Sequence, residues 1–142
     1  MTGMFPSQQR VVVLGASHKP ERYSNQAIRL LMECGHTVIP VHPRLDRVEG
    51  LPVVASLDAL ADPVDTLTLY VGPDRSAELV DAIIRLHPGR VIFNPGTESP
   101  ALESRLDAAG IPATTSATPR RTELSTAPSR WISRAVTPWP SR

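Results

Sequence analysis

The sequence has little of what several common classes of protein need. It contains one cysteine, Cys34, so no internal disulfide can form. Aromatic residues make up 4% of the chain, and no apolar run approaches the roughly 18 residues that a membrane span needs. The first ten residues, MTGMFPSQQR, lack the charged start and the apolar segment of a secretory signal. We therefore expect a cytoplasmic protein that does not enter a membrane.

Patterns of known catalytic centres are also missing. The chain shows no paired carboxylates, no Ser-His-Asp order, no P-loop and no His and Cys residues at metal-ligand spacing. We interpret Cys34 as a small apolar residue at the end of a helical pattern. We interpret His18, His36 and His87 as loop or capping residues, because none has a carboxylate or cysteine at suggestive spacing. The sequence thus predicts no catalytic or metal-binding residues and favours a protein that is not an enzyme.

The net charge of +1 hides an uneven distribution. Residues 1–110 carry ten Lys and Arg against thirteen Asp and Glu, whereas residues 111–142 carry five Arg against one Glu. The excess of basic charge therefore belongs to the C-terminal part and says little about the rest of the chain, and we expect no nucleic-acid partner.

Strand and helix patterns alternate along most of the chain. Apolar, β-branched runs predict strands at 11–14, 37–41, 66–71 and 90–93, and a weak strand at 111–115. Helical spacing predicts helices at 24–34, 74–86 and 100–109, and a short helix at 57–60. This order requires parallel strands with right-handed crossovers. We therefore predict a three-layer α/β domain, Rossmann-like with a mostly parallel sheet of about five strands, over residues 8–115.

Two local signals refine this prediction. Ser24 is expected to cap the first helix, which ends before Gly35. Residues 116–142 are rich in Pro, Ser, Thr and Arg without a sustained period, which indicates a tail that is disordered or loosely docked.

Small and turn-forming residues follow each of the four main strands. In an open parallel sheet, ligands bind at the carboxyl ends of the strands, so these segments are the candidate site. The segments are Gly15-Ala16-Ser17, Val41-His42-Pro43, Tyr70-Val71-Gly72-Pro73 and Asn94-Pro95-Gly96-Thr97.

The first turn departs from the dinucleotide-binding fingerprint. After Gly15, the second and third glycine positions of GxGxxG hold Ser17 and Pro20. The usual approach of bare backbone to a pyrophosphate is therefore not provided. Lys19 and Arg22, in the same loop, can supply positive charge to phosphates instead.

The end of the second strand lacks the acidic residue that an NAD site places near the ribose hydroxyls. His42, Pro43 and Arg44 stand there. Histidine and arginine suit a phosphorylated ribose better, which indicates NADP or the 3′-phospho-ADP half of coenzyme A.

Four motifs in order resemble those of the small stand-alone CoA-binding proteins. They are GASHKPERYS at 15–24, VIPVHP at 38–43, VDTLTLYVGP at 64–73 and VIFNPGTE at 91–98. That family is similar to the CoA-binding domain of the succinyl-CoA synthetase α-subunit, and the resemblance covers about residues 8–112.

The resemblance implies a Rossmann-like fold with a CoA groove formed by three sets of residues. It implies that the phosphates are held by Gly15, Ala16, Ser17, Lys19, Arg22 and Ser24. It implies that Val41, His42 and Pro43 flank the adenosine, and that the groove is completed by Val71, Gly72, Pro73, Asn94, Pro95 and Gly96.

The same resemblance does not carry ligase activity with it. The phosphorylated histidine of the synthetases belongs to a later domain, which this chain is too short to contain, and fold does not imply function. We expect a non-catalytic carrier, sensor or accessory protein for coenzyme A or an acyl-CoA, with a protein partner or a homodimer left open. The alternatives are an NADP- or other nucleotide-dependent enzyme, and a redox or regulatory module that acts with a partner.

The C-terminal part departs from the family pattern. Family members finish with an apolar strand segment, whereas this chain continues from Ile111 into polar sequence, TSATPRRTELSTAPSR. Divergence and a shifted reading frame are both open as its origin. Either one puts the edge of the sheet and a part of the groove wall in question.

Overall fold

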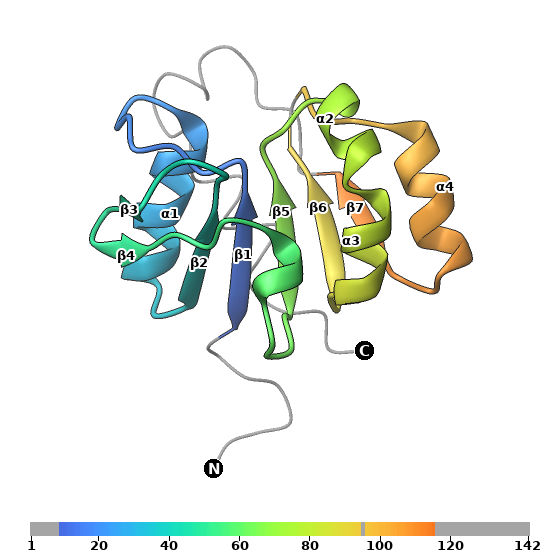
Figure 1. Cartoon of the computed structure of the whole chain (residues 1–142), viewed down its shortest axis with the longest axis horizontal. Helices are drawn as coiled ribbons and strands as arrows, with labels where there is room; N and C mark the ends of the chain where they lie inside the picture. The colour runs from blue at the N-terminus through green and yellow to red at the C-terminus, as the bar shows by residue number, and fades with distance from the viewer. Residues whose placement is uncertain (1–8, 95, 116–142) are drawn as a thin grey trace.

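The computed structural model describes residues 9–94 and 96–115, which form a three-layer α/β domain around a five-stranded sheet (Figure 1). The strands of this sheet are β1 (Arg10–Leu14), β2 (Thr37–Val41), β5 (Thr66–Leu69), β6 (Arg90–Phe93) and β7 (Ala113–Thr115). All neighbouring pairs in it are parallel. The predicted fold class is therefore confirmed.

The strand order is β2-β1-β5-β6-β7, so the chain reverses its direction of travel across the sheet next to β1. From β1 the chain adds β2 on one side and then crosses back to add β5 on the other. In register, Val11 lies opposite Val38 of β2 and Thr66 of β5. The carboxyl ends of β1 and β5 consequently flank a topological switch point, where open α/β sheets bind ligands.

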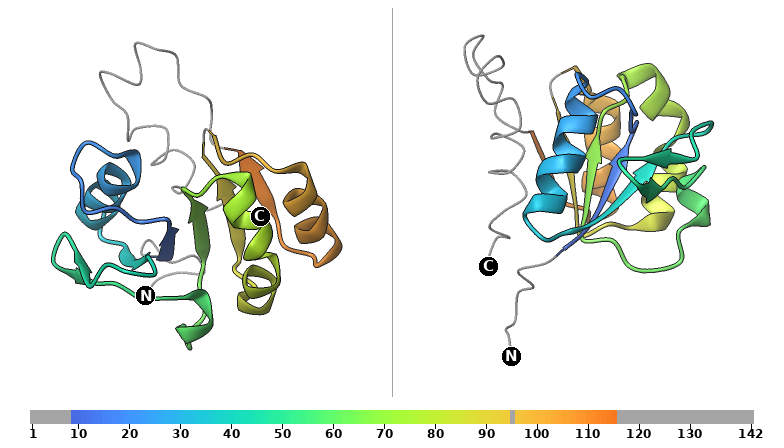
Figure 2. Two further views of the ribbon diagram at one scale, coloured as in Figure 1. Left: turned by 45° about the horizontal axis from the view of Figure 1, so that its top comes forward. Right: turned by 90° about the vertical axis from the view of Figure 1, so that its left-hand side faces the viewer.

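Helices cover both faces of the sheet (Figure 2). Helix α1 (Tyr23–Glu33) lies on one face, where Ala27, Ile28 and Leu31 pack against Val11 and Val13. The other face is covered by α3 (Val80–Leu86) and α4 (Pro100–Ala108), whose buried side chains pack on alternate strand residues. Because strand side chains alternate between faces, one apolar run in β1 supplies both halves of the core.

A short hairpin follows β2 in the sequence and precedes β5. It consists of β3 (Arg47–Val48) and β4 (Leu51–Pro52), which pair antiparallel. A 3₁₀ turn, η1 (Leu57–Ala59), follows it at the position of the predicted short helix. The sequence pattern predicts an irregular segment at 44–54 with a short extended piece at 51–54; the structure has a folded hairpin there, packed beside β2, and the extended piece begins as β4.

The single helix predicted at 74–86 is wrong, because two helices cover this range. Residues 74–86 form two helices, α2 (Pro73–Glu78) and α3, separated at Leu79, whose backbone lies at φ −105° and ψ 4°. The break changes the direction of the chain, so that Leu79 packs against the core while Ala77 is exposed. Helical spacing over 74–86 predicts Ala77 on the inward face with Val80 and Ile83, because it assumes one continuous helical period.

Two further expectations differ at helix α1. The helix begins at Tyr23 with Arg22 at the N-cap position, so Ser24 is a buried residue of the first turn rather than the cap. Cys34 lies at the end of the helix as expected, at the C-cap, but as an apolar residue it is exposed.

The other local predictions agree with the structure or fall outside it. His87 caps α3 in the left-handed region, and the weak last strand exists as β7. The interpretation of residues 116–142 as a tail lies outside the described residues. Within the described ranges, no helix has the length and apolar character that crossing a bilayer demands.

Candidate functional site

A cavity of about 770 Å³ opens at the carboxyl ends of the strands, beside the switch point. Its size lies in the range of sites for small molecules and cofactors. It is lined by the loop after β1, the segment after β2, the β5–α2 connection and the loop after β6. The segments that follow the four main strands therefore border one common cavity.

Most of the predicted binding residues line this cavity. They are Gly15, Ala16, Ser17, Lys19, Arg22, Ser24, His42, Val71, Gly72 and Gly96. Tyr70 and Thr97, at the same strand ends, also line it. The structure brings these residues together, and their contact with a ligand stays a prediction.

Four predicted residues are described but do not line the cavity. Val41 is buried, while Pro43 and Pro73 are exposed. Asn94 is buried, and its amide nitrogen donates to Thr68 Oγ1 at 2.6 Å and to the carbonyl of Leu69 at 2.8 Å. Asn94 thus ties the end of β6 to β5. Pro95 lies outside the described residues.

The backbone of the first turn is engaged within the fold. The N–H groups of Gly15 and Ala16 both donate to the carbonyl of Val41, at 3.1 and 3.2 Å. The N–H of Lys19 donates to Ser17 Oγ at 3.1 Å. These three N–H groups are therefore already used within the fold, while Lys19 and Arg22 give the loop side-chain charge that attracts anions.

Gly15 is required by close packing of the two central strand ends. Its φ is +95°, and a Cβ there would lie 2.8 Å from Val71 Cγ1 and 2.9 Å from the carbonyl carbon of Tyr70. Both the backbone conformation and the space favour glycine. Its role is thus to let β1 and β5 meet beneath the cavity.

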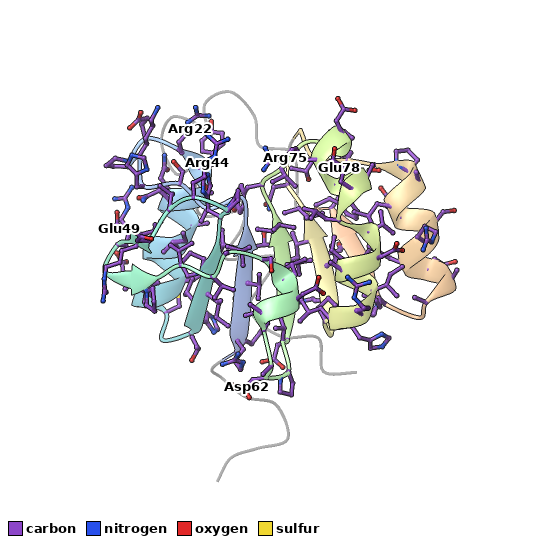
Figure 3. All side chains as sticks on the ribbon, viewed as in Figure 1. Arg22, Arg44, Glu49, Asp62, Arg75 and Glu78 are labelled. Atoms are coloured by element: carbon purple, nitrogen blue, oxygen red, sulfur yellow. The ribbon has the colours of Figure 1, made fainter. Side chains whose placement is uncertain are left out.

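Positive side chains gather around the cavity from three parts of the chain. Lys19 and Arg22 come from the first loop, Arg44 from the segment after β2, and Arg75 from α2. Figure 3 shows Arg22 and Arg44 above α1 and β2, with Arg75 across from them beside α2. No Asp or Glu is among the lining residues of the described chain. The cavity is therefore strongly cationic.

The cations of the cavity make none of the ion pairs found in the described chain. Those pairs are Arg10–Asp62, Arg85–Asp58 and Arg105–Asp81, all outside the cavity. A group of like charges without carboxylates repels itself and favours an anionic ligand.

His42 organises the segment that carries Arg44. Its Nδ1 accepts hydrogen bonds from the backbone N–H groups of Arg44 at 3.0 Å and Leu45 at 3.2 Å. Burial lowers the pKa of His42, and the nearby charges of Arg75, Arg44 and His18 lower it further. The imidazole is therefore neutral near pH 7, with its proton on Nε2.

Both tyrosines of the chain, Tyr23 and Tyr70, line the cavity. Tyr23 is 39% exposed. The hydroxyl of Tyr70 is buried and has no hydrogen-bond partner among the described residues, and burial raises the pKa of this phenol. The cavity wall thus combines aromatic surface with positive charge, which suits a nucleotide.

Sequence reasoning missed several residues of this cavity. Arg75 was not found, because the pattern of α2 was read for its apolar face alone. His18, Tyr23 and Leu45 were missed because local patterns do not reveal which loop side chains turn toward a common space. The charge of Arg75, one turn beyond Gly72, was the available signal.

The described residues contain no candidate metal site. No group of three or more His, Cys, Asp or Glu side chains there could hold a metal ion.

Comparison with known proteins points to one family. The family model described as CoA binding domain matches residues 9–119. A Bacillus subtilis protein, YneT, is 31% identical over 62 residues, which span 44% of this chain and 46% of that protein. The matched segment thus covers about half the length of this curated relative.

Solved structures share the fold. A Thermus thermophilus protein, cell-free ID.343, is 35% identical with a TM-score of 0.72, over 75% of this chain and 81% of that one. The dinucleotide-forming acetyl-coenzyme A synthetase 1 of Ca. Korarchaeum cryptofilum is 24% identical with a TM-score of 0.62, over 77% of this chain and 25% of the synthetase. The likeness to the synthetase concerns the fold alone.

Proposed function

Because the chain belongs to the CoA binding domain family, we propose that it binds coenzyme A or an acyl-CoA in the cavity at the strand ends. The ligand carries a diphosphate and a ribose 3′-phosphate, and its adenine offers a flat apolar face. This proposal rests on the match between those groups and the side chains around the cavity.

The observation that carries the proposal is the charge of the cavity wall. Lys19, Arg22, Arg44 and Arg75 line it without any Asp or Glu. Arginine binds phosphate with paired, charge-assisted hydrogen bonds. Arg44 and Arg75 approach from opposite sides (Figure 3), which suits a ligand whose phosphates lie at separate places.

We further propose a binding role without catalysis. His42 is the obvious candidate base, but its Nδ1 already accepts two backbone N–H groups and its Nε2 carries the proton. Protonation would cost both hydrogen bonds, so His42 is a poor base in this arrangement. A carrier, sensor or accessory protein of the cytoplasm, acting with a protein partner or a second copy, fits this role.

Isothermal titration calorimetry with CoA, acetyl-CoA, NAD and NADP tests the proposal. We expect CoA and acetyl-CoA to bind far more tightly than NAD, since NAD lacks a phosphorylated ribose. Failure of CoA to bind below about millimolar Kd, together with tight NADP binding, would replace this proposal by the NADP-dependent alternative.

Two matched variants show whether the cavity is the site. Arg75→Gln removes a charge that lines the cavity, whereas Arg85→Gln removes a charge that pairs with Asp58 elsewhere. We expect Arg75→Gln to weaken CoA about tenfold or more, as befits a charge-assisted hydrogen bond. Arg85→Gln should leave the affinity unchanged, and equal losses for both would place the ligand elsewhere.

A further inference from the structure

The cationic loop of residues 15–22 is held from beneath by helix α1. Three helix side chains donate hydrogen bonds to carbonyl oxygens of the loop. The pairs are Asn25 Nδ2 to Ser17 at 2.9 Å, Arg29 Nη2 to Pro20 at 2.8 Å and Gln26 Nε2 to Glu21 at 3.0 Å. Since this loop carries Lys19 and Arg22, these contacts determine where the two charges stand.

Asn25 is the centre of this arrangement. It is fully buried, and its Oδ1 accepts from Arg29 Nε at 2.9 Å. Its Nδ2 donates to the carbonyl of Ser17 and to Glu49 Oε2, the latter at 3.0 Å. The buried amide thus uses three of its four hydrogen-bonding positions, each on a different segment or residue.

Glu49 extends the network from helix α1 to the β3–β4 hairpin. It occupies the β3–β4 turn with φ +51°, a conformation that non-glycine residues seldom adopt. The strand β4 side of this hairpin is joined to the segment after β2, because His42 N–H donates to the carbonyl of Val54 at 3.1 Å. The N–H of Val53 donates to the backbone carbonyl of Asp46 at 2.9 Å. One amide therefore links the loop of Arg22 to the segment of Arg44.

This link counteracts the mutual repulsion of the cations around the cavity. Side chains of like charge repel one another when no ligand is present, so the loops that carry them tend to separate. A site gains affinity when its loops are already held in the binding arrangement, since less ordering is left for the ligand to impose.

We propose that Asn25 is a positioning residue, which holds the loop of residues 15–22 and the β3–β4 hairpin in register so that their cations meet the same ligand. This inference rests on the proposed function for the identity of the ligand. Asn25 itself does not line the cavity, so its effect must pass through the loop and the hairpin.

The first test compares Asn25→Asp with Met32→Ala. Asn25→Asp keeps the shape and the acceptor for Arg29 but removes both donors, whereas Met32 is exposed on the same helix. We expect Asn25→Asp to weaken CoA about tenfold, from the loss of two part-buried hydrogen bonds. Met32→Ala should bind as the wild type does. Asn25→Ala serves as a second variant without a buried carboxylate.

A double-mutant cycle separates positioning from general loss of structure. If Asn25 acts through the loop, Asn25→Ala should cost much less affinity in an Arg22→Ala background than alone. Additive losses would overturn the proposal, since a residue that supports the fold in general would weaken both proteins alike. Glu49→Ala should give a smaller loss than Asn25→Ala, because the contact with Ser17 persists.

Loop order in the ligand-free protein provides a readout that does not depend on CoA. NMR order parameters of the backbone amides in residues 15–22 should fall in Asn25→Ala and stay high in Met32→Ala. Unchanged order in Asn25→Ala would overturn the positioning role. If the wild type fails to bind CoA, the proposed function is wrong, while this measurement still decides whether Asn25 holds the loop.

Discussion

At the scale of the single residue, Gly15 is the tightest point of the site. We expect Gly15→Ala to lower the free energy of unfolding by roughly 1–2 kcal/mol from the left-handed backbone and about 1–3 kcal/mol from overpacking. The overpacking arises because the new Cβ would meet Val71 Cγ1 at 2.8 Å and the Tyr70 backbone at 2.9 Å. Urea unfolding measures the loss.

Gly35→Ala is the matched control for this prediction. Gly35 has φ +88°, but a Cβ there meets nothing within 4 Å. It should therefore show the backbone part alone, about 1–2 kcal/mol. Equal losses in both variants would contradict the idea that strand packing demands the glycine at position 15.

His36 gives a second prediction at this scale. Its Nδ1 accepts from the Gln9 N–H at 3.0 Å, and its Nε2 is buried and finds no partner within residues 9–94 and 96–115. Burial lowers the pKa of His36 from 6.5, and the charge of Arg90 lowers it further. The unfolded chain therefore binds more protons than the folded one just below pH 6.5. The stability contributed by neutral His36 is complete above that pH and is lost as the pH falls through the folded pKa.

Unfolding in urea between about pH 5 and about pH 8 tests this sign. His36→Asn keeps an acceptor near Gln9 but does not titrate, so its stability should fall less on acidification than that of the wild type. The pKa of His42 is also lowered. His36→Asn should therefore still lose some stability on acidification, and His42 contributes to that remaining loss. A wild type that loses no more than the variant would refute the role of His36.

At the scale of the element, Ser99 and Ser56 both occupy helix N-cap positions, but only one of them makes a capping hydrogen bond. Ser99 Oγ accepts from the Leu102 N–H at 3.2 Å and caps α4, whereas Ser56 at the start of η1 makes no such bond. Ser99→Ala should lower the free energy of unfolding by about 1 kcal/mol. Ser56→Ala should change it by less than about 0.5 kcal/mol. The reverse order of losses in urea unfolding would contradict the assigned cap.

Elements with a strong period could be predicted from the sequence, and those decided by tertiary packing could not. The runs at Thr37–Val41 and Arg90–Phe93 are strands as expected. Their nearly continuous apolar residues are typical of parallel strands that are covered on both faces. The break at Leu79 has no glycine or proline beside it. It depends on how α2 and α3 fit against the core, and a local pattern contains no such information.

At the scale of the whole molecule, the position of the site followed from strand order, while the connections within it did not. Residues after parallel strands had to lie at one edge of the sheet, so Ser17, His42 and Val71 could be grouped before the structure was known. The bond from Asn25 to Glu49 joins residues 24 positions apart through an irregular hairpin. Nothing in their local sequence indicates that they meet.

The distribution of charge over the whole molecule leads to a last prediction. Residues 9–115 hold ten Lys and Arg against thirteen Asp and Glu, yet four of those cations and none of the acids line the cavity. Such a charge focuses the field toward the cavity and attracts anions over several ångströms. CoA binding should therefore weaken, on the order of tenfold or more, as ionic strength rises from about 0.01 M to about 1 M and the Debye length falls from about 30 Å to about 3 Å.

Calorimetric titrations across this range provide the measurement, and variants locate its origin. Arg75→Gln should weaken CoA and also reduce the slope of log Kd against log salt, because one fewer cation acts on the ligand. Arg85→Gln should keep the wild-type slope, since its charge is paired with Asp58 at 3.1 Å away from the cavity. A slope that is flat in the wild type would mean that apolar contacts carry the binding, and an equal change in both variants would mean that net charge acts rather than the cavity.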